Sequence, residues 1–454
     1  MINKLFKQRY FLVSIQFLTL FVFVVLIYGA IGISTDDPDF AKILRNTNLA
    51  NLIVWSYWWP FIIVTAILFG RFWCTICPME LVTSFFSKIG FRKKPGKVLK
   101  SGWLITLFYA LILIVGIHTL AIHRIPQYMA IYMLMLFVIA SVIGLIYEKR
   151  TFCTHICPIG HLLGLYAMLS SKKLRVIDKN VCASCKTKDC ISKSKHYNFV
   201  GRSCTSELYP AELEDNRSCI LCGQCHKSCT KDNIAIQKQR LAADLFSDIH
   251  LSWAEISFFM MLSSFVIYEI LSEWLVSKAL IMALPNIMNQ ILQTTGALHG
   301  TVKAVSLFIL TPLVFYGFFA LLKKWLSKEN WKTVFTQLVV AILPITASMH
   351  LLKALLKTTS RIPYWDYVFN DPKGVETAQK ITENADVLDK NFIHSLSPFI
   401  SALAIIFSIG GLLLSQWVIQ KQNYKNTNSK YVSILVSVIY AGLFFVTLLA
   451  WRYF

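Results

Sequence analysis

Acidic residues are scarce in this sequence, and charged residues of both signs are few. Asp and Glu number 24 among 454 residues, and Asp, Glu, Lys and Arg together make up 15%, against roughly 25% in ordinary globular domains. Glycine (19) and proline (13) are too rare for a collagen-like chain, and a hydrophobic share of 56% excludes intrinsic disorder. The length excludes a disulfide-stapled miniprotein. The composition therefore disfavours a soluble protein and favours a membrane protein.

Long apolar runs supply the membrane segments. A spanning helix needs about 20 mainly apolar residues. Nine stretches meet this need: 10–33, 52–69, 102–121, 128–147, 251–271, 298–322, 333–352, 393–419 and 431–449. The first is too long for a signal peptide and has no small-residue cleavage site, so we expect an uncleaved anchor. The apolar stretch 272–297 is broken by Pro285, and we expect it to form an interfacial helix.

The distribution of Lys and Arg predicts the orientation. With the N-terminus inside, 33 of the 45 Lys and Arg residues fall in inner segments and 11 in outer ones, which is the bias of cytoplasmic loops. The C-terminus is then outside, and all 12 cysteines lie on the inner face. The formal charge of +21 is spread over five inner segments without a recognisable binding module, which argues against nucleic acid as a partner. We expect a multi-pass protein of the bacterial inner (cytoplasmic) membrane.

A cysteine run in the polar segment between spans four and five is typical of iron–sulfur proteins. Its spacing is C-x2-C-x2-C-x3-C, and it consists of Cys219, Cys222, Cys225 and Cys229. Bacterial ferredoxins use this spacing for [4Fe–4S] clusters: three cysteines hold one cluster and the fourth ligates another. Zinc would need only two C-x2-C pairs, so the third closely spaced cysteine favours a cluster. In a reducing cytoplasm disulfides are rare, which also favours ligands.

A second, stretched run supplies the remaining ligands for two clusters. It consists of Cys182, Cys185, Cys190 and Cys204, which are separated by two, four and thirteen residues. With the ferredoxin cross-over, cluster 1 takes Cys182, Cys185, Cys190 and Cys229, and cluster 2 takes Cys204, Cys219, Cys222 and Cys225. Arg202 and Lys227 stand near these cysteines, and we expect them to be solvated surface residues rather than groups that tune the clusters.

The last four cysteines form an internal repeat at the inner ends of spans two and four. Its two copies are Arg71-Phe-Trp-Cys74-Thr-Ile-Cys77-Pro78 and Arg150-Thr-Phe-Cys153-Thr-His-Ile-Cys157-Pro158, called here the CP motifs. The proline suits the first turn of a following helix, and a helix N-terminus favours thiolate. The two pairs together predict a third cluster, another metal site or a redox-active thiol pair; the alternative is a helix break with free thiols.

These motifs resemble those of the NapH/NosR-type membrane polyferredoxins. The resemblance covers about 52–240 and rests on the ferredoxin run and the two CP motifs with their shared arginine. It implies membrane-bound electron transfer linked to the quinone pool, or to a respiratory or maturation partner. The chain departs from the pattern in several ways: its first CP motif is one residue short, Thr205 and Thr230 replace the usual proline, and further spans follow the ferredoxin-like module.

Histidines and lysines mark the outer ends of the predicted C-terminal spans. His299, His350 and His394 fall at this level, and pairs of such residues could hold haem b or accept a proton from quinol. The alternative is ordinary interfacial histidine. Lys303, Lys353 and Lys357 follow at helical spacing, and they predict an anionic headgroup site or simple snorkelling. His118 and His123 stand at the same level.

The sequence as a whole predicts an α-helical polytopic membrane protein with a small cytoplasmic α+β ferredoxin-like module. The expected domains are 1–171 with four spans and the CP motifs, 172–250 with two clusters, and 251–454 with five spans. We expect electrons to pass between a cytoplasmic carrier such as a ferredoxin or flavodoxin and a membrane partner, which is quinone, a haem or another redox subunit. The alternatives are a maturation factor that reduces a metal and a redox-gated transporter. No catalytic residue is identified, and any enzymatic role would be that of a quinol/quinone oxidoreductase subunit.

Overall fold

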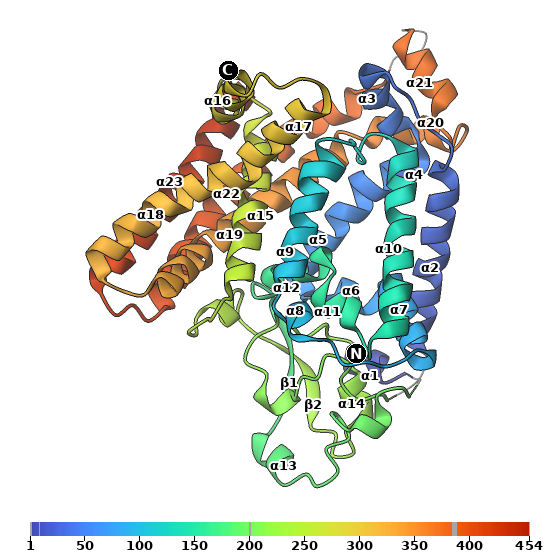
Figure 1. The fold of residues 1–454 in the computed structure, drawn as a ribbon, viewed down its shortest axis with the longest axis vertical. Coiled ribbons are helices and arrows are strands. Elements are labelled where there is room, and N and C mark those ends of the chain that lie inside the picture. The colour runs from blue at the N-terminus through green and yellow to red at the C-terminus, as the bar shows by residue number, and fades with distance from the viewer. Residues whose placement is uncertain (1, 9, 199–200, 384–387, 454) are drawn as a thin grey trace. The chain divides into compact units, whose positions relative to one another are not determined.

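The computed structural model describes residues 2–8, 10–198, 201–383 and 388–453. Helices dominate it, and the described residues form two short strands (Figure 1). The chain divides into two compact units, each built from separate stretches. Unit 1 contains Met1–Tyr28, Ile62–Ile105 and Ile131–Asp244, and unit 2 contains Gly29–Phe61, Thr106–Ala130 and Leu245–Phe454. All 12 cysteines therefore belong to unit 1.

Unit 1 combines long apolar helices with short helices and a two-stranded sheet. Its helices are α1 (Ile2–Lys7), most of α2 (Phe11–Ala30) and α5 (Trp59–Phe69), α6 (Phe72–Ile76), α7 (Pro78–Ile89), α8 (Lys97–Lys100), most of α10 (Pro126–Ile146), α11 (Thr151–His155), α12 (Pro158–Ala167), α13 (Lys179–Ala183) and α14 (Gln224–Ser228), with single 3-10 turns at Lys193–Lys195, Pro210–Glu212 and Ala243–Leu245. Two glycines allow close backbone approach: a Cβ on Gly90 would lie 2.1 Å from the Leu145 carbonyl oxygen, and one on Gly144 would lie 2.9 Å from that of Thr83.

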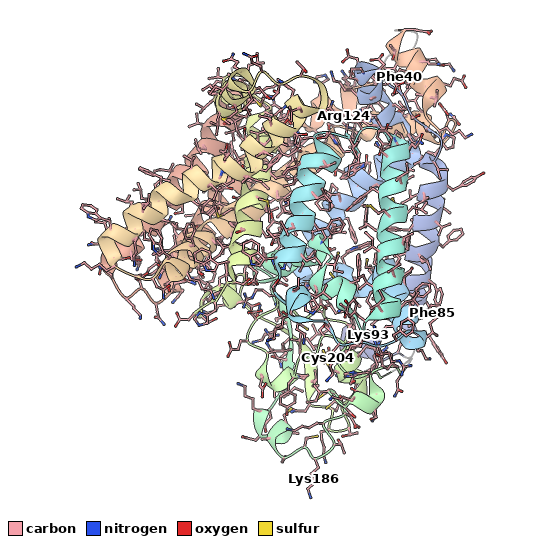
Figure 2. The ribbon with its side chains drawn as sticks, viewed as in Figure 1. Phe40, Phe85, Lys93, Arg124, Lys186 and Cys204 are labelled. Carbon is pink, nitrogen blue, oxygen red and sulfur yellow. The ribbon has the colours of Figure 1, made fainter. Side chains whose placement is uncertain are left out.

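The sheet of unit 1 packs directly on cysteines. Strand β1 (Lys172–Val176) pairs antiparallel with β2 (Ile234–Lys238), and the register sets Leu174 opposite Ile236. Leu174 and Ile234 are buried in one apolar cluster with Cys219 and Cys225. The alternation of inward and outward residues along a strand thus turns one face of this small sheet toward the cysteine run. Figure 2 shows the Lys186 side chain at the edge of unit 1, near α13, where it points away from the unit.

Unit 2 is a helical bundle around one long, buried helix. Its elements are α3 (Pro38–Thr47), α4 (Leu49–Leu52), a π-helical turn Ile53–Trp58, most of α9 (Trp103–Leu111), a π-helical turn Ile112–Ile117, α15 (Trp253–Leu271), α16 (Leu275–Ile291), α17 (Gly296–Val305), a π-helical turn Ser306–Leu310, α18 (Thr311–Ser327), α19 (Trp331–Thr359), a 3-10 turn Ile362–Tyr364, α20 (Trp365–Val368), α21 (Val375–Thr382), α22 (Asn391–Lys421) and α23 (Thr427–Tyr453). Helix α19 packs against α15, α18, α22 and α23. Its apolar residues are buried almost all round, which is the pattern of a helix at a bundle centre.

Eight helical segments in the described chain are long and apolar enough to cross a membrane. They are Phe11–Ala30, Leu49–Phe69, Pro126–Ile146, Trp253–Leu271, Gly296–Ser327, Trp331–Val368, Asn391–Lys421 and Thr427–Trp451. Eight of the nine predicted spans are therefore confirmed as long apolar helices. The predicted span 102–121 is instead a shorter apolar helix, Trp103–Ile117. Its last turn is π-helical, and the Leu120 amide then folds back onto the Val115 carbonyl, which ends the helix early.

Candidate functional site

Each CP motif joins a short helix to a longer one. Cys77 follows α6 in extended conformation (φ −66°, ψ 132°), and Pro78 opens α7. Cys157 does the same after α11 (φ −70°, ψ 111°), and Pro158 opens α12. The expected place of both prolines in a first helical turn is confirmed. The first backbone N–H groups of a helix have no partner within the helix. The Gly160 N–H therefore donates to the Cys157 sulfur at 3.4 Å.

The structure brings the four cysteines of the two CP motifs together. The pKa of Cys77 is raised by burial and then by three neighbouring thiols, those of Cys153, Cys157 and Cys74. Burial raises the pKa of Cys153 to about 11 and that of Cys157 to about 12, and neighbouring thiols add to both shifts. Reactive thiols have lowered pKa values in exposed, electropositive places. These buried thiols are therefore suited to a positively charged metal centre better than to thiol exchange.

A buried carboxylate with two arginines stands beside these thiols. Glu80 is 1% exposed, and its Oε1 lies 2.6 Å from Arg202 Nη2 and 3.5 Å from Arg150 Nε. Gln16 donates to Glu80 Oε2 at 2.6 Å. Burial alone raises the pKa of Glu80, but Arg202 and Arg150 outweigh it and the net shift is downward. The prediction that Arg202 is a solvated surface residue is wrong, because its side chain is only 16% exposed and pairs with Glu80.

Arg150 connects the CP motifs electrostatically to the ferredoxin run. Burial lowers the pKa of Arg150, but Cys153, Glu80, Cys74 and Cys222 raise it by more. Two sequence signals were available for this network. Arg150 repeats the position of Arg71, which donates to the Arg217 carbonyl at 2.7 Å and lies 3.8 Å from the Cys74 sulfur. Glu80, which the sequence analysis missed, is the only acidic residue between Asp39 and Glu148.

Four further cysteines form a second group in unit 1, built around the start of α14. They are Cys204, Cys219, Cys222 and Cys225. Burial raises the pKa of Cys219 to about 12, and Cys222 and Cys204 raise it further; Cys225 is shifted upward by burial and by all three partners. Gly223 has φ 63°, a left-handed conformation that suits glycine. A Cβ there would also lie 2.9 Å from Phe6 Cδ1, so glycine lets the loop wrap closely.

The remaining four cysteines form a third group, of which Cys190 and Cys229 pack against the same apolar cluster as Cys219 and Cys225. Cys182, Cys185, Cys190 and Cys229 line one narrow pocket with Tyr209 and Asn233. The Asn233 side chain donates from Nδ2 to the Cys182 sulfur at 3.2 Å, and its backbone N–H donates to the Cys229 sulfur at 3.3 Å. Burial and then Cys229 and Cys182 raise the pKa of Cys190 to about 11. The structure thus brings the eight thiols together in two sets with the membership of the cross-over, and their assignment to two clusters stays a prediction.

None of the three groups has the tight geometry of a single-ion site. Within the described ranges no three His, Cys, Asp or Glu side chains are placed to hold one metal ion. A cubane binds each thiolate at a different iron, so its four ligands stand farther apart than those of one zinc ion. Twelve soft sulfur donors in three groups of four, each group electrostatically coupled, therefore fit iron–sulfur clusters by donor type and number.

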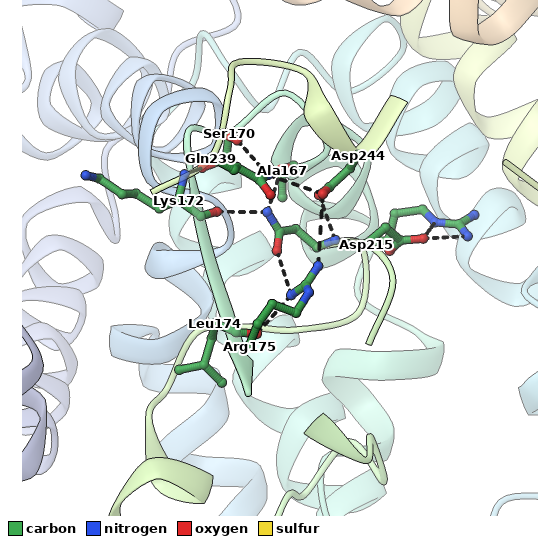
Figure 3. A network of polar contacts seen from close by, with 10 residues as sticks. Ala167, Ser170, Lys172, Leu174, Arg175, Asp215, Gln239 and Asp244 are labelled. Atoms are coloured by element: carbon green, nitrogen blue, oxygen red, sulfur yellow. Dashed lines mark hydrogen bonds and ion pairs between the residues drawn. The ribbon is translucent and has the colours of Figure 1, made fainter. Parts of the chain in front are cut away.

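A polar network fixes the segment that leads into Cys219 (Figure 3). The Asn216 side chain donates to the Lys172 carbonyl at 2.9 Å and accepts from Arg175 Nη1 at 3.3 Å. The Asn216 amide donates to Asp244 Oδ2 at 2.9 Å, and Gln239 donates to Asp244 Oδ1 at 3.2 Å. Buried polar groups that satisfy one another rigidify the backbone, so this network positions the loop that carries the cysteine run.

A cavity of about 390 Å³ opens beside Cys222. Its polar lining includes Glu80, Arg202, Lys149 and His196, and its apolar lining includes Leu12, Phe17, Leu81 and Phe85. The side chains of Phe17 and Phe85 in this lining are 56% and 59% exposed. A lining that combines charged and apolar side chains is suited to an amphipathic molecule.

The residues of the predicted histidine site fall in unit 2 and differ in exposure. His350 is 4% exposed and lies within ring-contact distance of Trp59 and Phe265, with centroids 6.3 Å from each. His299 and His394 are exposed. The three histidines lie on α17, α19 and α22. Their role as haem or quinone ligands stays a prediction.

Comparison with known proteins links the CP motifs to iron–sulfur chemistry. Residues 51–97 and 129–177 match the family described as a 4Fe–4S binding domain. The first stretch holds Cys74 and Cys77, the second holds Cys153 and Cys157, and the ferredoxin run lies outside both. The match, together with the apolar helices, supports iron–sulfur electron transfer in a multi-pass membrane protein.

One similar protein is an uncharacterized protein of Methanocaldococcus jannaschii. It is 30% identical over 176 residues, which are 37% of this chain and 65% of the relative. The chain therefore spans just under two thirds of that relative's length. No solved structure matches the chain.

Proposed function

We propose that this chain is a membrane-bound iron–sulfur protein that passes electrons between a cytoplasmic carrier and the membrane, in the manner of the NapH/NosR-type polyferredoxins. Cluster 1 would be held by Cys182, Cys185, Cys190 and Cys229, and cluster 2 by Cys204, Cys219, Cys222 and Cys225. When bound, [4Fe–4S] clusters supply one-electron transfer. The observation that carries the proposal is the assembly of these eight thiols into two groups of four within unit 1.

The CP motifs hold a third [4Fe–4S] cluster in this proposal. The family match covers both motifs and none of the other eight cysteines. The four thiols are mutually coupled, and Arg150 and Arg71 place positive charge beside them. A thiolate-bound cluster carries net negative charge, so nearby guanidinium groups stabilise it in a buried place. Metal binding would also hold these thiols deprotonated despite their raised pKa values.

The partners follow from the surroundings of each cysteine group. Cys185 is near the surface, and Lys186 and Lys188 flank it, which suits docking of an acidic ferredoxin or flavodoxin. The cavity beside Cys222 suits a quinone: apolar residues receive the tail, while Lys149 and His196 face the polar ring. We place the cysteines on the cytoplasmic side of a bacterial inner membrane, where the basic inner segments also face anionic lipid. Other membrane redox subunits are candidate partners.

Anaerobic purification with iron and sulfide analysis tests the cluster assignment. We expect about 12 irons per chain, and about 8 in the double variant Cys153→Ser/Cys157→Ser, with the electron paramagnetic resonance signals of clusters 1 and 2 retained. Thr154→Ala is the matched control and should keep all 12. About 8 irons in the unchanged chain would show that the CP motifs hold no cluster, and fewer than about 4 would overturn the whole proposal.

Filling the cavity beside Cys222 tests the quinone partner. Leu81→Trp should slow reoxidation of the reduced protein by a soluble quinone analogue at least about tenfold, because the larger ring occupies the space of the quinone ring. Leu107→Trp on exposed α9 surface is the control. Equal rates in both variants, at equal iron content, would mean that quinone does not react through this cavity.

A further inference from the structure

A cavity of about 720 Å³ in unit 2 has an excess of cationic side chains in its lining. Six lysines and arginines line it with only two glutamates: Arg45, Arg124, Lys303, Lys353, Lys357, Arg361, Glu269 and Glu273. Four formal positive charges are therefore unmatched, with His118 and His123 alongside. The proposed electron-transfer function does not use this cavity.

Both glutamates are already engaged by one lysine. Lys353 Nζ lies 2.5 Å from Glu273 Oε1 and 3.6 Å from Glu269 Oε2, and it also donates to the Glu269 carbonyl at 2.8 Å. The other five cations form no ion pair within 4.0 Å in the part of the chain that the structure describes. Lys357 and Lys303 face the rings of Trp55 and Tyr268 instead, at 5.9 and 5.8 Å.

Three arginines concentrate like charge at this cavity. Burial and then the guanidinium groups of Arg361 and Arg124 lower the pKa of Arg45 to about 10. Arg45 Nε, Arg361 Nε and His123 Nδ1 are buried and have no hydrogen-bond partner among the residues that the structure describes. Buried donors without partners are costly, and like charges that face one another in a partly buried place repel. An anion between them would remove both costs.

We propose that this cavity binds an anion of the phosphate class, held by Arg45, Arg124 and Arg361. The planar guanidinium fork matches the oxygens of a phosphoryl group, and several arginines around one cavity are typical of phosphate recognition. The apolar lining, which includes Ile117, Leu356 and Ile400, also provides room for hydrocarbon. The phosphate group therefore comes either from a phospholipid headgroup or from a free phosphate compound.

The position of the arginines on their elements suits a headgroup or a solute from outside the bilayer. Arg45 lies in the last turn of α3, and Arg361 directly follows α19 and its cap residue Ser360. Arg124 lies in the turn just before Pro126, the first residue of α10, and therefore at the N-terminal end of that helix (Figure 2). The predicted topology puts all three at the outer face of the membrane, where headgroups and solutes are accessible.

Thermal unfolding of the full chain with defined ligands tests the proposal. The protein, purified in neutral detergent, is titrated with short-chain phosphatidylglycerol, with phosphatidylcholine and with inorganic phosphate. A ligand that binds the folded state raises the melting temperature. We expect stabilisation by phosphatidylglycerol or by phosphate, and binding at least about tenfold weaker in Arg45→Gln/Arg361→Gln. Lys425→Gln removes one exposed charge from unit 2 away from the cavity and should bind as the unchanged chain does.

The outcomes separate the two sources and can reject the site. Stabilisation by phosphatidylglycerol alone assigns a lipid headgroup, and stabilisation by inorganic phosphate assigns a free phosphate compound. If the double variant does not fold, the single variant Arg124→Gln replaces it, with the same expected loss. Equal stabilisation of the variant and the unchanged chain, or no response of the unchanged chain to any ligand, overturns the proposal.

Discussion

At the residue scale, cysteine spacing predicted which thiols the fold groups together, because short spacers keep cysteines close to one another; their role as cluster ligands stays a prediction. Within the run, Cys219, Cys222 and Cys225 are close enough in sequence to share one group, whereas Cys229 joins the other group. The buried ion pairs could not be predicted in this way. Glu80 and Arg202 are 122 residues apart, and only folding brings the loop of Arg202 onto α7. Sequence spacing contains no signal for such a contact, so Arg202 was assigned to the surface.

Removing the charge of Glu80 should destabilise unit 1. Glu80→Gln keeps the shape of the side chain but leaves Arg150 and Arg202 without a buried counter-charge. Breaking one partner of a buried ion pair costs about 3–5 kcal/mol, so the melting temperature should fall by several degrees. Asp232→Asn breaks the exposed ion pair with Lys7 and should leave the melting temperature nearly unchanged. Equal melting temperatures for both variants would show that the Glu80 network adds no stability.

Asp244 should make stability fall as the pH rises from about 4 to about 6. Burial raises the pKa of Asp244 to about 6 although Arg175 opposes the shift. The folded state therefore holds this proton more tightly than the unfolded state, and the resulting stability is full below pH 4 and is lost as the pH rises through 6. The loss is on the order of 2–3 kcal/mol. In Asp244→Asn, unfolding followed across this range should show a smaller decline, and an unchanged decline would assign it to other groups.

At the element scale, the length of apolar runs predicted the helices well because membrane crossing sets their length. Eight of nine predicted spans are long helices, and α16 is a separate helix with Pro285 inside it. The exception is 102–121, whose composition is as apolar as that of its neighbours. Its end is set by the π-helical turn at Ile112–Ile117 and by the backward bond from Leu120 to Val115. Hydropathy contains no information on a change of hydrogen-bond register.

Close helix packing at α12 depends on one glycine. A Cβ on Gly164 would lie 2.7 Å from the Arg217 carbonyl oxygen, a backbone atom in the segment that leads to Cys219. Gly164→Ala should therefore destabilise the fold by about 1–3 kcal/mol and lower the iron bound by cluster 2. Gly317→Ala on α18 is the matched control, because nothing lies within 4 Å of its Cβ position. Thermal unfolding and iron analysis of the two variants compare the effects, and equal behaviour would contradict the role of Gly164.

At the scale of the whole molecule, the two units could not be predicted from the chain order. The division into the consecutive domains 1–171, 172–250 and 251–454 stays a prediction. Each unit gathers three separate stretches, with boundaries inside α2, α5, α9 and α10. Continuous helices that contribute to two compact units leave no change of composition at the boundary. Linker signals such as glycine, proline or charge runs are therefore missing where the units divide.

The short helix Trp103–Ile117 decides which side of the membrane the cysteines face. At 1.5 Å per residue it is about 22 Å long, less than the roughly 30 Å hydrocarbon core. If it crosses, aided by local thinning or by the residues up to Ala121, there are nine crossings and the two termini lie on opposite sides. If it does not, every later segment changes side, and the 16 Lys and Arg residues of 149–250 would face outward together with ten cysteines, on the opposite side from Cys74 and Cys77.

Reporter fusions distinguish the two topologies. Nine crossings predict that alkaline phosphatase fused after Phe454 is active and that green fluorescent protein at the same place is dark. The reverse result is expected for fusions after Lys425, in the segment between α22 and α23. Because basic loops resist translocation, we expect the nine-crossing pattern. Active phosphatase after Lys425 and none after Phe454 would place Cys185 outside the cytoplasm, where a ferredoxin or flavodoxin could not reach it, and the proposed electron donor would have to be abandoned.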